Sequence, residues 1–427
     1  MQYAKVQKTK LNDIIGDVSL TPEFIRSPES DFTRKRKLDF STTFNTILTM
    51  GGMTLDKELF DLFEGHDSIP SKSAFVQCRD KILPEAFVHV FYAYTQQLRK
   101  YKQWRGYHLL AVDGSRINIA RDPSDTDSYI RRKKGKGFNA LLLSTVYDVL
   151  NHHYVDAVIQ GHNNQDERGA FIKMMPNFSP KSIVIADRGY ESYNVLAHLH
   201  EACQNYVIRV KDIHSNGIAS KLNLPQGECD EIVTMHITNF QSDEYKKLAN
   251  HRFSPSIARF DFSSKAHPIY QLTFRIVRLQ LEDGSYQCLI TNLPANFSSC
   301  DLKYLYKLRW GIETSYRELK YSVGLVNLHA KKRTSIIQEI FAKLILHNFS
   351  KSIVQNTLFF NQDTTHDYQV NFVMAVYICR HFLRFSNTHS SNIETHLLRY
   401  LTPIRENRSF ERTLKPQSFT SFIYRVS

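Results

Sequence analysis

Short apolar runs, rather than a helical repeat, dominate the chain from about residue 107 onward. Three of these runs are bounded by polar turns, which predicts three strands. They are HLLAVD, NALLLSTVYD and HHYVDAVIQG. Amphipathic spacing in QDERGAFIKMMPNF then predicts a helix, which is followed by the strand KSIVIAD, a helix over about 191–204 and the strand YVIRVKD. The pattern therefore predicts an α/β unit in which three strands are followed by helix, strand, helix and strand.

Residues 212 to about 300 interrupt this unit with further strand patterns. The runs are EIVTMHI, ARFDFS, YQLTFRIVRLQL and YQCLITN. The last two are joined by Glu-Asp-Gly-Ser, which predicts a hairpin turn. Only then does the next amphipathic helix follow, YKLRWGIETSYRELK at 306–320. We therefore expect a β-rich insertion that splits the α/β unit.

The two ends of the chain have helical patterns. At the N-terminal end these are STTFNTILTM, TLDKELFDLF and the long segment from 71 to 100. The stretch 54–82 has the length of two short helices across a turn, so a helix-turn-helix and a plain helical bundle are both open. SIIQEIFAKLILHNFSKSIV and NFVMAVYICRHFLRF predict packing helices near the other end.

These patterns predict a fold of the α/β class made of five stretches. They are a helical N-terminal region at 1–105, the first part of an α/β core at 106–211, the β-rich insertion at 212–300, the last part of the core at 301–350, and a helical C-terminal region with a basic tail at 351–427.

Composition narrows the class of protein. The chain has 427 residues, 42% of them hydrophobic, which is typical of a globular protein of several domains. There is no apolar run of the length that spans a bilayer and no apolar core of a signal peptide at the start, so we expect a cytoplasmic protein. Lys and Arg exceed Asp and Glu by 55 to 42, which favours nucleic acid as a partner over a membrane. The six cysteines form no CxxC pair and indicate neither a zinc site nor a disulfide framework.

The basic residues are concentrated in three dense runs. They are RKRK at 34–37, RRKKGK at 131–136 and KKR at 331–333. Each run alone is typical of a solvated loop, but three together indicate phosphate contacts. In the second run the candidate DNA-binding residues are Arg131, Arg132, Lys133, Lys134 and Lys136.

Three carboxylates stand out by their position. Asp113 is expected to end the first strand and Asp187 the fourth, and the carboxyl ends of strands in α/β sheets are where ligand and catalytic groups collect. The alternative is ordinary turn chemistry or a helix N-cap. Glu313 follows on the helix after the last strand. Three convergent carboxylates can hold hard divalent cations, which prefer oxygen ligands and commonly bind phosphate as well.

The helix at 306–320 carries a narrow polar row beside its apolar stripe. Tyr306, Arg309, Glu313 and Lys320 fall within an arc of roughly 60° if the helix is regular. A solvated helix face is the alternative, because Arg309 and Glu313 also form an i,i+4 pair of the kind that many exposed helices carry.

The segments LLAVDGS, IVIADRGYESYN and YKLRWGIETSYRELK resemble the DDE transposases of bacterial insertion sequences, in the insertion-sequence-four group. The hallmark of that group is Y-x2-R-x3-E-x6-K, which Tyr306, Arg309, Glu313 and Lys320 match at every spacing. The resemblance covers about 105–350. It implies a ribonuclease-H-like core, with a β insertion between the second Asp and the Glu.

The resemblance also implies roles, cofactors and partners. Asp113, Asp187 and Glu313 would be the catalytic metal ligands for two Mg²⁺ ions, with Mn²⁺ as a substitute. Tyr306, Arg309 and Lys320 would lie at the DNA end. The expected partners are double-stranded DNA, as terminal inverted repeats and as target, and a second protomer when two ends are paired. We expect no membrane partner, and a location in the bacterial cytoplasm on the nucleoid.

The function expected from these observations is a metal-dependent DNA transposase that frees a 3′-OH at the element's ends and joins it to target DNA. A related nuclease that cuts without joining, and a catalytically inactive DNA-binding derivative, remain as alternatives. Some relatives use a Trp of the insertion to hold a flipped base during hairpin formation, but 212–300 contains no Trp. Phe253 or Tyr270 could stack instead, so hairpin formation stays open. The aspartates at 122, 125 and 127 resemble a calcium loop only loosely and indicate a solvated loop.

Overall fold

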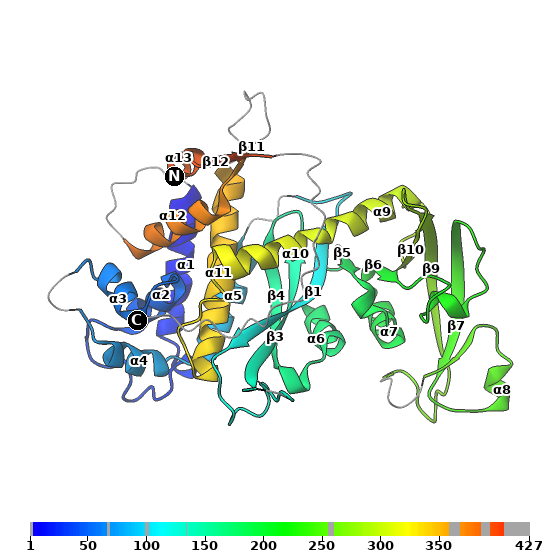
Figure 1. Cartoon of the computed structure of the whole chain (residues 1–427), viewed down its shortest axis with the longest axis horizontal. Helices are drawn as coiled ribbons and strands as arrows, with labels where there is room; N and C mark the ends of the chain where they lie inside the picture. The colour runs from blue at the N-terminus through cyan, green and yellow to red at the C-terminus, as the bar shows by residue number, and fades with distance from the viewer. Residues whose placement is uncertain are drawn as a thin grey trace.

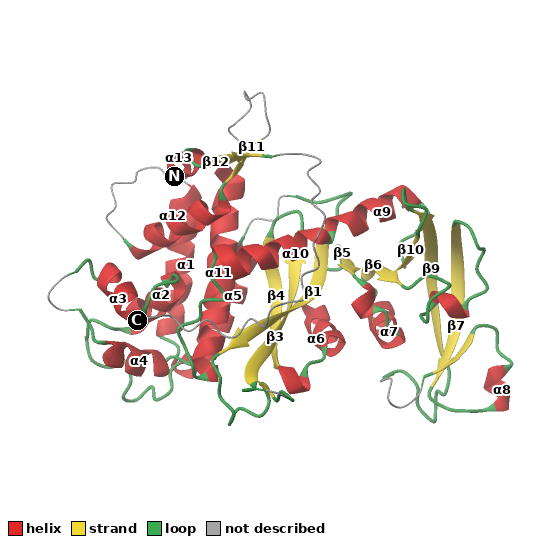
Figure 2. Ribbon diagram, viewed as in Figure 1, coloured by secondary structure: helices red, strands yellow, loops and turns green. Residues whose placement is uncertain are grey.

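The computed structural model describes residues 3–65, 69–98, 102–133, 135–254, 260–357, 368–385 and 393–404. The fold is mixed α/β: a large central sheet has a helical layer at one end of the molecule and a β-rich extension at the other (Figures 1 and 2). Lys134 and the basic tail from 405 onward lie outside the described residues.

Helices from both ends of the chain form one layer beside the sheet (Figure 1). They are α1 (Tyr3–Ser19), α2 (Phe40–Thr49), α3 (Leu55–Leu62), α4 (Lys72–Asp80), α5 (Pro84–Gln97), α11 (Arg333–Thr357), α12 (Phe372–Arg384) and α13 (Ile393–Leu398). The helices predicted from STTFNTILTM, TLDKELFDLF and the two C-terminal segments are confirmed. The helix α1 was not singled out by its pattern.

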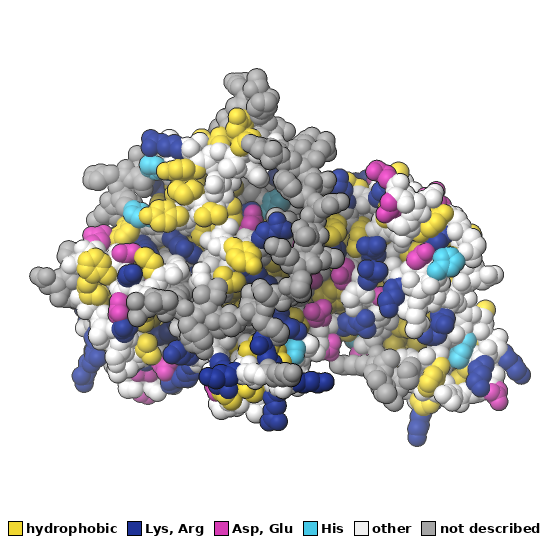
Figure 3. All heavy atoms as spheres, viewed as in Figure 1, with side chains coloured by type: hydrophobic (Ala, Val, Ile, Leu, Met, Phe, Trp, Pro, Cys, Tyr) yellow, Lys and Arg dark blue, Asp and Glu magenta, His cyan; other side chains and the backbone are white. Residues whose placement is uncertain are grey.

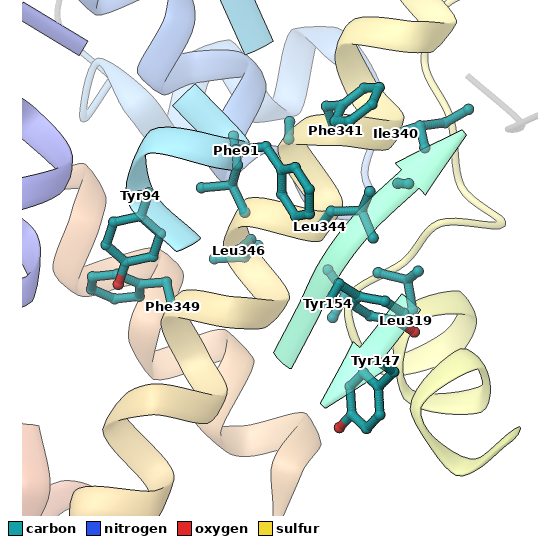
Figure 4. Close-up of a cluster of buried hydrophobic side chains, with 14 of the residues drawn as sticks. Phe91, Tyr94, Tyr147, Tyr154, Leu319, Ile340, Phe341, Leu344, Leu346 and Phe349 are labelled. Carbon is teal, nitrogen blue, oxygen red and sulfur yellow. The ribbon is translucent and has the colours of Figure 1, made fainter. Parts of the chain in front are cut away.

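The long helix α11 is the centre of this layer, buried along most of its length between α2, α5 and α12. Figure 4 shows its Phe341 facing Phe91 of α5, and the two ring centroids are 5.6 Å apart. A buried ion pair joins Arg79 of α4 to Glu339 of α11 at 2.7 Å. Within the described parts of the chain, no helix is both long and apolar enough to cross a membrane.

The central sheet has ten strands in the order β2-β3-β1-β5-β6-β10-β9-β7-β8, with β4 pairing on β3. Its first half contains β1 (His108–Ile119), β2 (Tyr129–Ile130), β3 (Phe138–Asp148), β4 (His153–Gly161), β5 (Ser182–Ala186) and β6 (Asn205–Val210). The strands β1, β3 and β4 are antiparallel neighbours, whereas β5 runs parallel to β1 and to β6. The predicted order of three strands, helix, strand, helix and strand is thus confirmed, with the short β2 added.

The two faces of this half-sheet are covered by different helices. Successive side chains on a strand point to opposite faces. Leu109 and Ala111 of β1 accordingly pack into the cluster that contains the helical layer, whereas Leu110 and Val112 pack with α6 (Glu167–Met174) and α7 (Tyr193–Glu201). The edge strand β4 is covered by α11, whose Asn348 bonds both the N–H and the C=O of Tyr154 at 2.8 Å. These hydrogen bonds satisfy backbone groups of an edge strand, which could otherwise pair with a strand of another chain.

The β-rich stretch continues the same sheet. The strands are β7 (Cys229–Thr238), β8 (His251–Phe253), β9 (Tyr270–Gln280) and β10 (Tyr286–Thr291), with the short helix α8 (Asp243–Lys246) between β7 and β8. β10 pairs antiparallel with β6, and β9 with β10, so the insertion extends the core laterally. The predicted Glu-Asp-Gly-Ser hairpin is confirmed, with Gly284 at φ +79° as its turn requires.

One predicted strand of the insertion is wrong. The described part of ARFDFS, residues 260–263, forms no strand. Asp261 instead accepts a hydrogen bond from the Asn194 side chain of α7 at 3.0 Å, and Phe260 packs against the ring of Tyr270. Side-chain contacts with α7 thus replace a ladder. The alternating apolar pattern could not distinguish the two arrangements.

Candidate active site

Asp113 lies within β1 rather than at its end, which corrects the sequence prediction. The Gly114-Ser115 pair has the composition of a turn, but both residues stay in the antiparallel ladder with β3, which runs on to Ile119. The parallel ladder with β5, in contrast, ends at Ala111. Asp113 therefore emerges at the carboxyl edge of the parallel part of the sheet, which is where ligand groups are expected in such sheets.

Asp187 directly follows β5 and lies beside this position. Its Oδ1 accepts a hydrogen bond from the Gly189 N–H at 2.8 Å, so it also caps the short turn after the strand. Alternation along β1 and β5 puts Asp113 on the face of Ala111 and Asp187 on the face of Ile185, and both of these core residues face the helical layer. The two aspartates thus share one face of the sheet.

The predicted helix at 306–320 is divided into three segments, which is a second correction. These are α9 (Ser299–Leu308), α10 (Trp310–Arg317) and a π-helical turn at Glu318–Ser322, with Arg309 at the first junction. The apolar periodicity continues through both junctions, so it did not reveal them. π-helical turns are uncommon and occur frequently at functional sites. Lys320 lies in this turn, so its angle to Glu313 differs from that of a regular helix.

The helix α10 is fixed to the strand that carries Asp113. The hydroxyl of Tyr316 lies 2.8 Å from the carbonyl oxygen of Asp113 and 3.0 Å from that of Leu143 on β3. It also accepts a hydrogen bond from the Thr145 hydroxyl at 2.8 Å. Because Tyr316 is buried, these contacts fix where α10 crosses β1, and with it the position of Glu313.

Glu313 is held by Arg309. The guanidinium Nη2 donates to Glu313 Oε1 at 2.7 Å, and the Arg309 side chain is 5% exposed against 33% for Glu313. Burial alone would lower the pKa of Arg309, but the hydrogen bond to Glu313 and the charges of Tyr306 and Asp187 raise it above its usual value. Arg309 is therefore a permanent cation placed among the carboxylates, and the solvated-face alternative for this pair is excluded.

The carboxylates act on one another electrostatically. The pKa of Asp113 is raised to about 7, chiefly by burial and also by the charges of Asp187 and Glu167, against the lowering effects of the Gly114 N–H and Arg309. A carboxyl group with this pKa is poorly stabilised as an anion, and a nearby cation would favour the charged form. Carboxylate oxygens are also the donors that a hard divalent cation prefers.

Glu167 is a fourth carboxylate at this site, and the sequence pattern did not single it out. It begins α6, and its Oε1 would lie 2.6 Å from a Cβ built on Gly114. Burial and the charge of Asp187 raise its pKa. An acidic residue in the first turn of a helix is common because of the helix dipole, so its position alone carried no functional signal. A hollow of about 560 Å³ opens here, lined by Gly114, Glu167 and Gly189 among others.

The remaining residues of the four-residue signature differ in exposure. Lys320 is half-buried, and the charge of Asp113 partly offsets the lowering of its pKa by burial. Tyr306 is buried, and the guanidinium carbons of Arg209 and Arg309 lie 5.8 and 5.7 Å from its ring centroid. Lys320 is thus close to Asp113, whereas Tyr306 and Arg309 lie on the buried side of the site. Contact of these three residues with DNA stays a prediction.

The three carboxylates are not gathered into a closed cluster. Among the residues that the structure describes, no three Asp, Glu, His or Cys side chains lie close enough together to hold a metal ion. The Glu313 carboxylate is paired with a protein cation, Arg309, instead.

The basic runs differ in their surroundings. Arg131, Lys133 and Lys136 are exposed, and the guanidinium of Arg132 lies 5.1 Å from the ring centroid of Phe138. The β1–β3 register sets Asn139 opposite Ile119 and Thr145 opposite Asp113. The end of this loop that joins β3 is therefore six residues, or about 20 Å, along the strand from Asp113.

Two side chains of the KKR run, in contrast, form ion pairs within the protein, and contact of this run with phosphate stays a prediction. Lys332 pairs with Asp80 at 3.0 Å, and Arg333 pairs with Asp125 at 3.2 Å and Asp127 at 2.6 Å. The same pairs account for two aspartates of the loop at 122–127, which is neither a calcium loop nor simply solvated.

Figure 3 places these charges on the molecule. Acidic side chains collect in the hollow between the helical part and the insertion, and Lys and Arg side chains gather on the insertion side of that hollow. One aromatic candidate for base stacking is engaged: the hydroxyl of Tyr270 donates to Glu201 at 2.6 Å, and its ring packs against Phe262.

Comparison with known proteins identifies the family. The family described as "Transposase DDE domain" matches residues 104–349, more than half of the chain. The chain therefore belongs to the DDE transposase family. Over 363 residues it is 23% identical to the transposase InsG for insertion sequence element IS4 of Escherichia coli (strain K12), which covers 80% of this chain and 75% of that protein. Among solved structures, it is similar to the piggyBac transposase synaptic complex with hairpin DNA, with a TM-score of 0.43 and 10% identity over 96% of this chain and 86% of that one.

These findings confirm the resemblance that the sequence motifs predicted. The chain is a DNA transposase of the IS4 group, and the family is one of metal-dependent enzymes that cleave DNA and transfer the cut strand.

Proposed function

We propose that this transposase cleaves a phosphodiester at the ends of its element and joins the freed 3′-OH to target DNA, with Asp113, Asp187 and Glu313 at the reacting phosphate. One observation carries the proposal: α10 is bonded through Tyr316 to the backbone of Asp113, while Asp187 leaves the neighbouring parallel strand on the same face. The mutual effect of Asp113 and Asp187 on the pKa of Asp113 supports their proximity. The surface salt-bridge alternative has no comparable support, because Arg309 is buried.

We further propose that these three carboxylates hold two Mg²⁺ ions, with Mn²⁺ as a substitute. Oxygen donors from carboxylates, completed by substrate phosphate, suit hard divalent cations. Bound there, the ions would polarise the scissile phosphate and activate the attacking oxygen. The raised pKa of Asp113 supports a site that needs a cation to keep its carboxylates charged.

The chain's own residues have distinct proposed tasks. Tyr316 keeps α10 against β1, and Arg309 orients Glu313 by taking one of its two carboxylate oxygens. Lys320, half-buried near Asp113, is placed to neutralise a phosphate at the DNA end. The ring of Tyr306 lies against the Arg309 guanidinium and supports it. Because Tyr306 and Arg309 are buried, they would contact a phosphate directly only if the DNA entered the site.

The core is proposed to be ribonuclease-H-like. The antiparallel set β4-β3-β1, followed by the parallel strands β5 and β6, agrees with the strand order implied by the resemblance. The insertion between Asp187 and Glu313 agrees as well. A DNA-binding role for 1–105 and the boundaries at 106–211, 212–300, 301–350 and 351–427 belong to the same proposal.

The proposed partners are the terminal inverted repeats and the target duplex, bound by a homodimer that pairs two DNA ends. The formal net charge of +13 supports a polyanionic partner. A bacterial DNA substrate would place the protein on the nucleoid, in the cytoplasm.

One assay separates this proposal from its alternatives. Purified protein is incubated with labelled end DNA, a target plasmid and Mg²⁺. Joined products support the transposase with an active site as proposed. Cut products alone would favour a nuclease, and a gel shift without cutting would favour an inactive DNA-binding derivative.

A further inference from the structure

A second hollow, which we call the basic pocket, lies beyond Asp187 and has a volume of about 240 Å³. Four cationic side chains line it, each from a different element. They are Arg168 of α6, Arg188 of the turn after β5, Lys211 of the loop after β6, and Arg252 of β8 in the insertion. Such a convergence costs electrostatic energy unless an anion is present.

The protein supplies little negative charge to the basic pocket. Glu191 is the one acidic residue in the lining, and its two oxygens accept the backbone N–H groups of Lys211 at 2.9 Å and Ile218 at 2.6 Å. Across the residues that the structure describes, Arg188 and Arg252 form no ion pair with a carboxylate. The lining therefore carries an excess of positive charge.

Tyr193, at the start of α7, also lines the basic pocket. The hydroxyl of Tyr193 is buried and has no hydrogen-bond partner within the described residues. Burial raises its pKa to about 12, so the hydroxyl keeps its proton and can donate. Tyr193 begins α7, and the preceding Ser192 does not cap the helix with its side chain. An uncapped helix N-terminus adds N–H groups that favour an anion.

The basic pocket adjoins the carboxylate site. Arg168 lines both hollows, and its Nε donates to the Gly189 carbonyl at 2.8 Å. Arg188 is the residue after Asp187. The volume of about 240 Å³ is below the range of about 300–1,000 Å³ typical of small-molecule sites, which suits one charged group better than a cofactor. Because the phosphates of a DNA strand follow one another closely, a strand at the carboxylates brings a neighbouring phosphate within reach.

We propose that the basic pocket binds a backbone phosphodiester of the DNA strand next to the reacting phosphate. The inference rests on the proposed function of the carboxylate site. Two DNA segments offer this chemistry: the element end with its flanking sequence, and the target duplex. In either case the insertion would contribute directly to strand placement through Arg252.

The test combines a charge-neutral variant with charge-neutral DNA. Lys211→Gln/Arg252→Gln removes two cations from the basic pocket and leaves Asp113, Asp187 and Glu313 intact. Lys173→Gln/Lys181→Gln removes two exposed cations from α6 and from the loop before β5, and is the matched control. Methylphosphonates replace single phosphates, one position at a time, in end DNA with its flank and separately in target DNA.

We expect the basic-pocket variant to bind DNA about tenfold more weakly than the wild type, with a salt dependence about one unit less steep. One methylphosphonate position should weaken binding of the wild type and of the control variant but not of the basic-pocket variant. The arm that contains this position, end or target, identifies the source of the phosphate. Thermal melting verifies that each variant is folded.

An unchanged affinity, salt slope and methylphosphonate profile in the basic-pocket variant would overturn the assignment, while wild-type cutting and joining would leave the proposed function standing. A wild-type protein that neither binds nor cuts end DNA would overturn both.

Discussion

The hydroxyl of Tyr316 lies 2.8 Å from the carbonyl oxygen of Asp113. The third carboxylate of the candidate site is thus fixed relative to the first by a buried hydrogen bond between α10 and β1. This contact depends on a side chain one turn beyond Glu313, on the same helix. Positioning of the site is therefore a property of the packing of α10, and not of the carboxylates alone.

Tyr316→Phe should separate positioning from ligand chemistry. It removes the hydroxyl that contacts the Asp113 and Leu143 carbonyl oxygens and leaves the buried Thr145 hydroxyl without its Tyr316 acceptor, so the free energy of unfolding should fall by about 1–3 kcal/mol. Cleavage should fall as well, while end binding is retained. Tyr304→Phe, on the exposed side of α9, is the control and should change neither quantity. Wild-type stability in Tyr316→Phe would show that this contact does not hold the helix.

Gly114 and Glu167 should be coupled. A methyl group at Gly114 would meet Glu167 Oε1 at 2.6 Å and displace it. We expect Gly114→Ala to lower the cleavage rate and to raise the Mg²⁺ concentration needed for half-maximal rate. Glu167→Ala should remove most of that difference in the double variant, because contacting residues give non-additive effects. Strictly additive effects on the rate would argue against the contact.

Neutralising Arg131, Lys133 and Lys136 should weaken binding to all DNA sequences alike. For each phosphate that the loop no longer neutralises, the dependence of log K on log salt should flatten by about one unit. The distance of this loop from the carboxylates predicts an unchanged cleavage rate at saturating DNA. If the variant keeps the wild-type salt slope, the loop is simply solvated.

The buried pair Arg79–Glu339 should give a pH-dependent stability. Burial alone would raise the pKa of Glu339, but Arg79 and His329 lower it far below its usual value. Because the folded pKa is depressed, the stabilisation is present above the unfolded pKa of about 4.3 and is lost as the pH falls toward the folded pKa. Glu339→Gln should therefore cost about 3–5 kcal/mol at pH 7 and less at pH values below about 4.

Urea unfolding at several pH values measures this difference, and the apolar double variant Arg79→Met/Glu339→Leu is the control. It removes both charges, so no buried charge is left unpaired, and the His329 and Ala330 N–H groups lose their acceptor at every pH. The cost of the double variant should therefore lack the pH dependence expected of Glu339→Gln. An effect of Glu339→Gln that is independent of pH would contradict the account of this pair.

Much of the fold was predictable because local periodicity reports directly on burial. The strands β3 to β6, the helices α6 and α7 and the hairpin before β10 follow from apolar runs and turn residues. The continuation of β1 past Gly114 was not predictable, since it depends on pairing with β3. The break at Arg309 and the π-helical turn around Lys320 leave the apolar spacing unchanged and were also missed.

The candidate site, like the fold, could be predicted from the sequence only in part. Asp113 and Asp187 were singled out by their place after apolar strands and Glu313 by the spacing of the signature, but the burial of Arg309 and its bond to Glu313 depend on packing against the sheet. Glu167 enters the site because β1 has no side chain at Gly114, a relationship between distant residues that no local pattern contains.

Arg309 and Lys320, the two cationic signature residues around Glu313, should affect how the DNA end is bound and positioned. Arg309→Ala and Lys320→Ala should weaken end binding or misplace the end, at a cost of about 1–3 kcal/mol for each charge-assisted hydrogen bond that the variant cannot form.

Chelation of divalent metal by EDTA should abolish cleavage in the wild type without abolishing binding.

The most direct measurement is Mg²⁺-dependent cleavage of labelled end DNA by Glu313→Gln beside the wild type, with end affinity and melting temperature measured on the same samples. The substitution keeps the size of the side chain and removes its ligand charge. The account predicts that cleavage is lost while end binding and folding stay close to wild type. A Glu313→Gln protein that cuts the end at the wild-type rate would contradict the assignment of this carboxylate to the active site.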